Sequence, residues 1–169
     1  MSPRLNVFGV GILIFALSSH AQAQVAMTTR SREALRNDVS IELLGNSILY
    51  SFSYQRMLSN AFALNAGLSA LGQGSSSGSS SIVFIPVGAK LYLMPRNGSI
   101  YLGGGGVFVS SKVTSGPFGD GGASTTYGYA GLGFEYRSSG GLLFRGTAYG
   151  LFSNGSYFTW PGLSVGYAF

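Results

Sequence analysis

With 169 residues the chain is long enough for one domain, and it is 46% hydrophobic but only 9% charged, against about 25% charged in soluble globular domains. The absence of cysteine excludes disulfides and thiolate metal sites, and the scattered basic residues behind the net charge of +5 form no patch for nucleic acid. No stretch reaches the roughly 20 apolar residues of a spanning helix, so this membrane-like composition favours a transmembrane β-barrel.

Residues 1–23 have the three parts of a secretory signal peptide. Arg4 supplies positive charge, residues 7–17 form a short apolar run, and Ala21-Gln22-Ala23 is a small-residue cleavage site. We expect cleavage after Ala23, with cleavage after Ala21 as the alternative; the apolar run is short for an uncleaved anchor helix. Residues 24–38, which are rich in arginine, are then expected to be a short periplasmic N-terminal segment, and 39–169 the barrel domain.

From residue 39 onward, alternating segments are separated by turn residues, the pattern of a transmembrane barrel. In each segment, apolar side chains take one face of a strand and small or polar side chains take the other. The pattern predicts an all-β, up-and-down transmembrane barrel of eight antiparallel strands, at 39–46, 48–57, 61–71, 82–94, 99–110, 125–137, 142–152 and 161–169. Pro86 indicates a bulge or a poorly paired position. The glycines at Gly103–Gly106 leave the register of the fifth strand open.

The connections between these strands alternate in length, as they do in outer-membrane barrels. Tight turns are expected at 58–60, 95–98 and 138–141, and longer loops rich in glycine and serine at 72–81, 111–124 and 153–160. The first outer connection, near Gly45–Ser47, is unusually short. An even strand number with this alternation places both chain ends on the periplasmic side.

The polar face of these strands carries mostly Ser, Gly, Asn, Thr and Tyr. That face holds too little charge for the outside of a soluble barrel but suits a filled lumen. An eight-stranded lumen is narrow enough for side chains to fill, so no wide pore is expected. The inward charges are expected to form a structural network, with an ion or proton path as the alternative; they are Glu42, Lys90, Glu135, Arg137 and Arg145.

One pair in this network follows from local geometry. The turn at 138–141 makes the sixth and seventh strands a hairpin, in which the numbers of opposed residues have a constant sum near 280. Glu135 then lies opposite Arg145, and both point into the lumen, where they are expected to form an ion pair.

Two segments resemble parts of known barrels. The strand from Pro161 to Phe169 alternates large and small residues and ends on phenylalanine, like the closing strand of bacterial outer-membrane β-barrels. Residues 42–54 resemble the first hairpin of small outer-membrane barrels of unassigned function. The chain therefore resembles the small eight-stranded barrels of the OmpA/OmpX-like superfamily. The resemblance implies an outer-membrane monomer among membrane lipids and lipopolysaccharide, with Phe169 read by the barrel-assembly machinery.

No enzyme chemistry is expected. The sole histidine, His20, lies in the signal peptide, so the mature chain lacks the usual general base and the thiol nucleophile. Gly103–Gly106 is followed by no Lys-Ser/Thr and is not a phosphate loop. The sequence predicts no catalytic, cofactor-binding or metal-binding residue. It favours a structural or surface-interaction role, with a narrow channel for small solutes or a soluble lipid-binding barrel as alternatives.

Two expected loops are candidate contact surfaces. One contains Pro117, Phe118 and Asp120, and the other contains Tyr157, Phe158 and Trp160. The aromatic side chains of these loops are equally suited to anchoring at a membrane interface.

Overall fold

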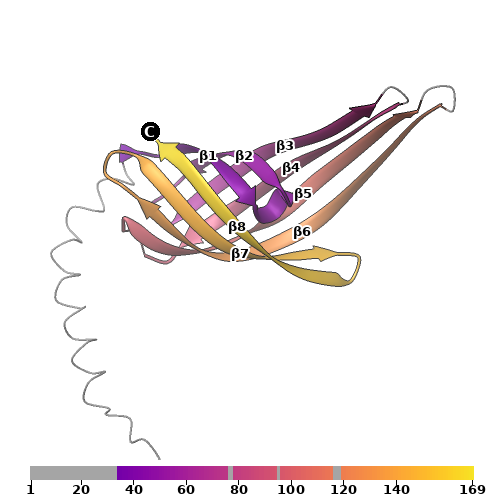
Figure 1. Cartoon of the computed structure of the whole chain (residues 1–169). Coiled ribbons are helices and arrows are strands. Elements are labelled where there is room, and N and C mark those ends of the chain that lie inside the picture. Colours follow the sequence, from indigo (N-terminus) through magenta and orange to yellow (C-terminus); the bar gives the residue numbers. More distant parts are fainter. Residues whose placement is uncertain (1–33, 76–77, 95, 116–118) are drawn as a thin grey trace, which may run out of the picture.

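The structure, a computed structural model, describes residues 34–75, 78–94, 96–115 and 119–169; the expected signal peptide lies outside them. Eight antiparallel strands form a closed barrel in which each pairs with its neighbours in chain order and the last pairs with the first (Figure 1). They are β1 (Asn37–Leu44), β2 (Tyr50–Met57), β3 (Phe62–Ser75), β4 (Gly78–Tyr92), β5 (Gly98–Ser115), β6 (Gly119–Arg137), β7 (Leu142–Ser153) and β8 (Ser156–Ala168). The predicted all-β, up-and-down barrel is confirmed. In the described part of the chain, no helix is long and apolar enough to cross a membrane.

The predicted facing of the strands is also confirmed. On β8, Leu163, Val165 and Tyr167 are exposed on the outer surface, whereas Ser164 and Ala168, which alternate with them, are buried in the lumen. The same alternation on the other strands covers the outside of the barrel with large apolar side chains, Phe52 and Leu132 among them, each more than half exposed. This arrangement is the reverse of a soluble barrel.

β5 and β6 are each six residues longer than the sequence pattern predicted, and β3 and β4 are three and two residues longer. The expected loops at 72–81 and 111–124 are largely strand, because β3 pairs with β4 as far as Ser75↔Gly78 and β5 with β6 as far as Ser115↔Gly119. The expected loop at 153–160 is likewise reduced to a turn at 154–155. Glycine and serine give no hydrophobic alternation to read, but their backbones continue the ladder of hydrogen bonds.

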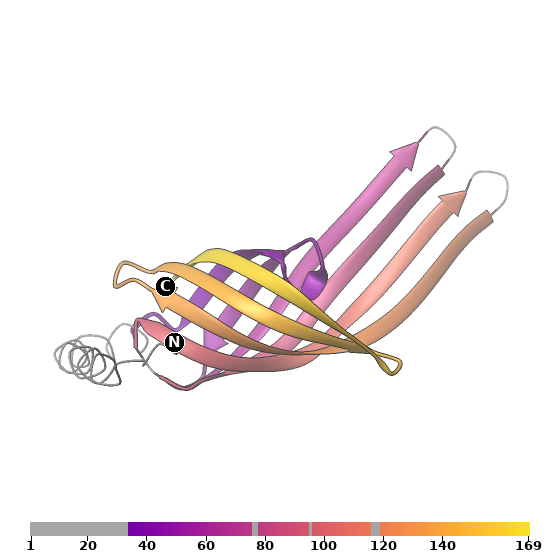
Figure 2. The same ribbon diagram turned by 60° about the horizontal axis from the view of Figure 1, so that its bottom comes forward.

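The lengthened strands form an open sheet beyond the rest of the barrel (Figures 1 and 2). We call it the projecting sheet; it consists of residues 69–75, 78–84, 109–115 and 119–127. Pairing of β2 with β3 stops at Phe52↔Leu68, and pairing of β6 with β7 stops at Gly128↔Phe152. The projecting sheet therefore has two free edges, one on β3 and one on β6.

The register of the strands is continuous. Glu135 pairs with Arg145, as predicted, and Gly103 pairs with Lys90 on one side and Gly131 on the other. At Pro86, the β3–β4 ladder is interrupted between Ala66↔Val87 and Ser69↔Phe84 without a change of offset. The poorly paired position is therefore confirmed and the bulge is not, because proline removes a donor without adding a residue.

Glycines on the inner wall make room for tyrosine rings. Tyr101 pairs across β5–β6 with Gly133, which pairs across β6–β7 with Thr147. The Tyr101 ring lies over Gly133, and its hydroxyl forms a hydrogen bond of 2.5 Å with the Thr147 hydroxyl. The glycine is needed because a Cβ there would overlap the ring.

We expect Gly133→Ala to destabilise the barrel by about 1–3 kcal/mol, because the added methyl group displaces the Tyr101 ring from its hydrogen bond. Gly121→Ala is the control, since a Cβ at that strand position meets nothing within 4 Å. Urea unfolding in detergent micelles measures both. Equal stability of the two variants would contradict the packing described for Gly133.

Candidate functional site

The part of the lumen nearest the short turns is crossed by a ring of four charged side chains. Asp38 Oδ2 accepts hydrogen bonds of 2.8 Å from both Arg137 Nη2 and Arg145 Nη2. Glu135 accepts the other bonds, from Arg145 Nε at 2.6 Å and from Arg137 Nε at 3.3 Å. The four residues, which we call the charged ring, are all buried. Two carboxylates and two guanidinium groups alternate in it, so its formal charges cancel.

Neutral side chains complete the charged ring. Tyr92 on β4 donates a hydrogen bond of 2.6 Å to Glu135 Oε2, and Gln55 on β2 donates one of 2.9 Å to the Tyr92 hydroxyl. Arg145 Nη1 also donates to the Ser40 hydroxyl at 3.2 Å. The resulting network joins β1, β2, β4, β6 and β7 through the lumen. These hydrogen bonds and ion pairs offset the free-energy cost of removing the charges from water.

The charged ring differs from the predicted network in its members. Glu135, Arg137 and Arg145 belong to it, as predicted. Glu42 instead accepts hydrogen bonds from Tyr149 at 2.8 Å and Ser164 at 3.4 Å. The Lys90 ammonium lies 5.0 Å from the centre of the Tyr101 ring, in a cation–π contact. Glu42 and Lys90 therefore lie outside the hydrogen-bonded ring itself.

Asp38 was missed because the arginine-rich composition before it set the predicted strand start at residue 39. It lies within β1, at 0% exposure. The alternation of Asp38 and Ser40 with Val39 and Ile41 was the available signal, since it already places Asp38 on the inner face.

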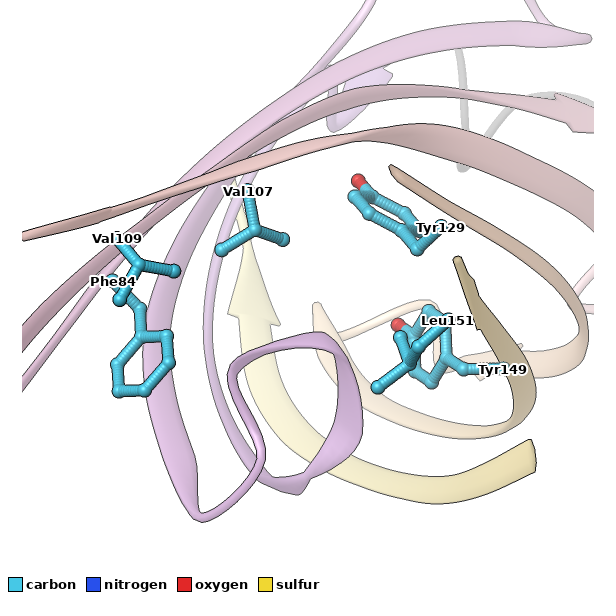
Figure 3. Packing of buried hydrophobic residues seen from close by; sticks show 6 residues of the cluster. All are labelled: Phe84, Val107, Val109, Tyr129, Tyr149 and Leu151. Atoms are coloured by element: carbon cyan, nitrogen blue, oxygen red, sulfur yellow. The ribbon is translucent and has the colours of Figure 1, made fainter. Parts of the chain in front are cut away.

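The opposite part of the lumen is filled by an apolar cluster and a folded-in turn. Side chains from β4, β5, β6 and β7 point together into this part (Figure 3) and form one buried cluster: Phe84, Val107, Val109, Tyr129, Tyr149 and Leu151. The short connection after β1 is a 3₁₀ turn, η1 (Gly45–Ser47), whose residues are buried. Tyr127 donates a hydrogen bond of 2.5 Å to the Asn46 carbonyl, which fixes the turn to β6.

This turn replaces the predicted end of the first strand at residue 46. Gly45 has φ +72°, a conformation that ends the extended backbone and favours glycine. Trp160 Nε1 donates a hydrogen bond of 3.1 Å to the Ile48 carbonyl, so the aromatic part of β8 holds the same connection from the other side. Side chains and backbone thus fill the lumen at both levels.

The structure places the residues of the two predicted contact loops differently. Pro117 and Phe118 lie outside the described residues, and Asp120 pairs with Thr114 in the projecting sheet. Tyr157 and Phe158 are exposed, whereas Trp160 is partly buried against the apolar cluster. In the described part of the chain, no three His, Cys, Asp or Glu side chains are grouped to hold a metal ion.

Comparison with known proteins defines the class of the fold. It is that of the eight-stranded outer-membrane barrels, which confirms the resemblance drawn from the closing strand and the first hairpin. The chain is similar to the N-terminal β-barrel domain of OprF from Pseudomonas aeruginosa, with a TM-score of 0.54 and 14% identity over 80% of this chain and 96% of that one.

It is also similar to Ail, the attachment invasion locus protein of Yersinia pestis, solved with the heparin analogue sucrose octasulfate. The TM-score is 0.53, with 16% identity over 80% of this chain and 95% of that one. Neither a family model nor a curated protein matches the sequence. At these identities the two solved structures establish the fold alone.

The charged ring predicts strong coupling between Glu135 and Arg145. Arg145→Met leaves two carboxylates short of a buried partner and should cost about 3–5 kcal/mol of unfolding free energy. Adding Glu135→Gln should recover part of that loss. A double-mutant cycle by urea unfolding in detergent measures the coupling, with exposed Lys112→Met as the control. Additive losses would contradict the ring.

The filled lumen predicts no large, steady conductance in planar bilayers, because an eight-stranded interior packed with side chains leaves no continuous water path. Single-channel recording of the purified protein checks this. Reproducible openings on the nanosiemens scale would instead support the channel alternative.

Proposed function

We propose that this protein is an integral, non-enzymatic outer-membrane barrel that binds an extended segment of an external partner through its projecting sheet. The apolar outer wall supports the membrane location, because exposed Ile41, Leu102 and Phe144 would otherwise face water. The short connections between β2 and β3, β4 and β5, and β6 and β7 lie at one end and suit the periplasmic side. The projecting sheet lies at the other end and would extend outside the cell.

The free edge of β3 carries the binding part of this proposal. From Leu71 to Gly74, β3 pairs in the sheet with β4 on one side only, so its other side offers backbone N–H and C=O groups to a further strand. At the start of this edge, the Ala70 carbonyl accepts a hydrogen bond of 2.5 Å from the Tyr50 hydroxyl. Such an edge is a template for a further strand. Natural proteins usually keep exposed edge strands short or covered, because a long one pairs with other chains.

A groove of about 380 Å³ runs from this edge across β4 to β5. Apolar side chains from four segments line it: Leu49, Leu71, Ile82 and Val113. Gln73, Ser80 and Ser111 add polar groups. An extended segment added to β3 would present alternate side chains to the groove, which suits a partner with one apolar residue among small polar ones.

The charge of the projecting sheet argues against a sulfated polysaccharide as the partner. Among its described residues, Lys112 is the only basic one. Binding of many sulfate groups needs several cations close together. The sucrose octasulfate bound to Ail therefore gives no reason to assign that ligand class to this chain.

The remaining partners follow from the membrane location. We propose that outer-membrane lipids and lipopolysaccharide surround the barrel as a monomer, and that the barrel-assembly machinery reads the strand ending at Phe169. Phe169 points outward and is 53% exposed. Its backbone N–H and C=O both bond to Asn37, so the end of this strand also closes the barrel.

Cell fractionation tests the location. The protein is expected in the outer membrane, and its unboiled form is expected to migrate differently from its boiled form on a gel, because the closed barrel resists detergent. Recovery of the wild type in the soluble periplasm, with identical mobility in both states, would contradict the proposed location.

The variant Phe169→Glu should sharply reduce the amount of protein in the outer membrane while secretion across the inner membrane continues.

Proline substitutions test the free edge. Of two adjacent strand residues, one directs its N–H to β4 and the other to the free edge. The probe is a set of peptides selected from a random displayed library for binding to the purified protein. Of the variants Gly72→Pro and Gln73→Pro, the one that removes an N–H from the free edge should abolish peptide binding without lowering the stability of the barrel. Gly121→Pro and Gly122→Pro, on the β6 edge, are the matched controls. Peptides that bind all four variants equally would refute strand addition at β3.

A further inference from the structure

The outer wall has a hollow of about 780 Å³ that spans β8, β1, β2 and β3. Two rows of outward side chains bound it. The row nearer the short turns is Tyr167, Val39, Tyr54 and Ala66, and the other is Val165, Ile41, Phe52 and Leu68. Within each row, every residue pairs with the next across neighbouring strands, so the hollow runs across the strands rather than along one of them.

The floor of the hollow is the backbone of the row between the two, Gly166, Ser40, Ser53 and Gly67. The side chains of this row face the lumen, so none of them enters the hollow from the outside. Three strand spacings make the hollow about 14 Å long, and its lining is almost wholly apolar. A long, narrow, apolar trough of this kind has the shape of an extended acyl chain.

Arg56 places a positive charge beside the hollow, on the side of the short turns. It lies on the outer face of β2, two residues beyond Tyr54 toward the short turns, and it is exposed. It pairs with Leu64, the outward neighbour of Ala66 along β3, so the small Ala66 leaves the trough open toward it. Arg56 forms no ion pair or hydrogen bond with any residue that the structure describes. An arginine at the rim of a membrane wall extends to the headgroup level.

We propose that this hollow and Arg56 together bind one phospholipid of the periplasmic leaflet, with an acyl chain in the trough and the phosphate on the guanidinium group. The proposal rests on the membrane location proposed above and adds a specific lipid site to it. Phosphate is the partner that matches a planar guanidinium group in this position.

A second copy of the chain is the competing occupant, and the charges disfavour it. The described residues of β8, β1, β2 and β3 that point outward include no Asp or Glu. A copy packed on this wall through the same surface would therefore cover Arg56 without supplying a carboxylate. A lipid phosphate supplies the missing negative charge.

Native mass spectrometry after reconstitution in phosphatidylglycerol and phosphatidylethanolamine bilayers tests the site. The wild type should retain one phospholipid after detergent extraction. Ala66→Phe fills the trough and should abolish retention, and Arg56→Gln should lower it about fivefold through loss of one surface cation. Ala130→Phe, at an exposed position of β6, and Lys112→Gln, in the projecting sheet, are the controls and should retain the lipid.

A gel of the same samples, boiled and unboiled, reports insertion independently. An inserted wild type without retained phospholipid, or equal retention by Ala66→Phe and Ala130→Phe, would overturn the lipid site and leave the membrane location intact. A dimer that Ala66→Phe dissociates would assign the hollow to a second copy. Failure of the wild type to insert would overturn both the site and the location.

Discussion

The charged ring constrains the rest of the barrel, because two guanidinium groups and two carboxylates are closed off from water inside the lumen. Asp38 comes from the start of the chain's first strand, whereas Arg137 and Arg145 come from β6 and β7. These bonds need Glu135 and Arg145 in register and β1 next to β8. A slip of β6 by one residue, for example, would turn Glu135 and Arg137 outward and leave Asp38 and Arg145 without these partners. The ring thus specifies one closure of the barrel among those that strand alternation alone permits.

In the rest of the lumen, tyrosine side chains pack over glycines of neighbouring strands. Tyr101 over Gly133 is one example, and Tyr129 is another: it lies over Gly105 and Gly88 and reaches Asn65, the next residue in the same cross-strand row. These glycines thus lie where the ring of a tyrosine from another strand packs across the inner surface of the barrel. With η1 folded into the mouth, side chains and backbone occupy the lumen as they do in a protein core.

A filled lumen leaves the outside of the barrel as the place for molecular recognition. The two proposed surfaces differ in the contact that they offer. The projecting sheet offers unpaired backbone groups beside a small apolar groove, and the hollow over β8 to β3 offers an apolar trough with one cation. The first suits a peptide segment, because its backbone can form hydrogen bonds with the unpaired backbone groups. The second suits a lipid, because an acyl chain binds through apolar contact and needs no hydrogen-bonding partner.

The sequence by itself determined the eight strands, their facing and the pairing of Glu135 with Arg145. These depend on side-chain alternation within a segment and on the length of one turn, both of which are local. The tertiary structure decided which charges meet: Asp38 joins arginines about a hundred positions away, whereas Glu42 and Lys90 bind tyrosines. It also decided the length of the strands through 72–81 and 111–124, where glycine and serine carry no alternation and the partner strand holds the ladder. Contacts across the lumen join strands that are not neighbours in the sheet, as Asp38 and Arg137 show, and the alternation within one segment does not encode them.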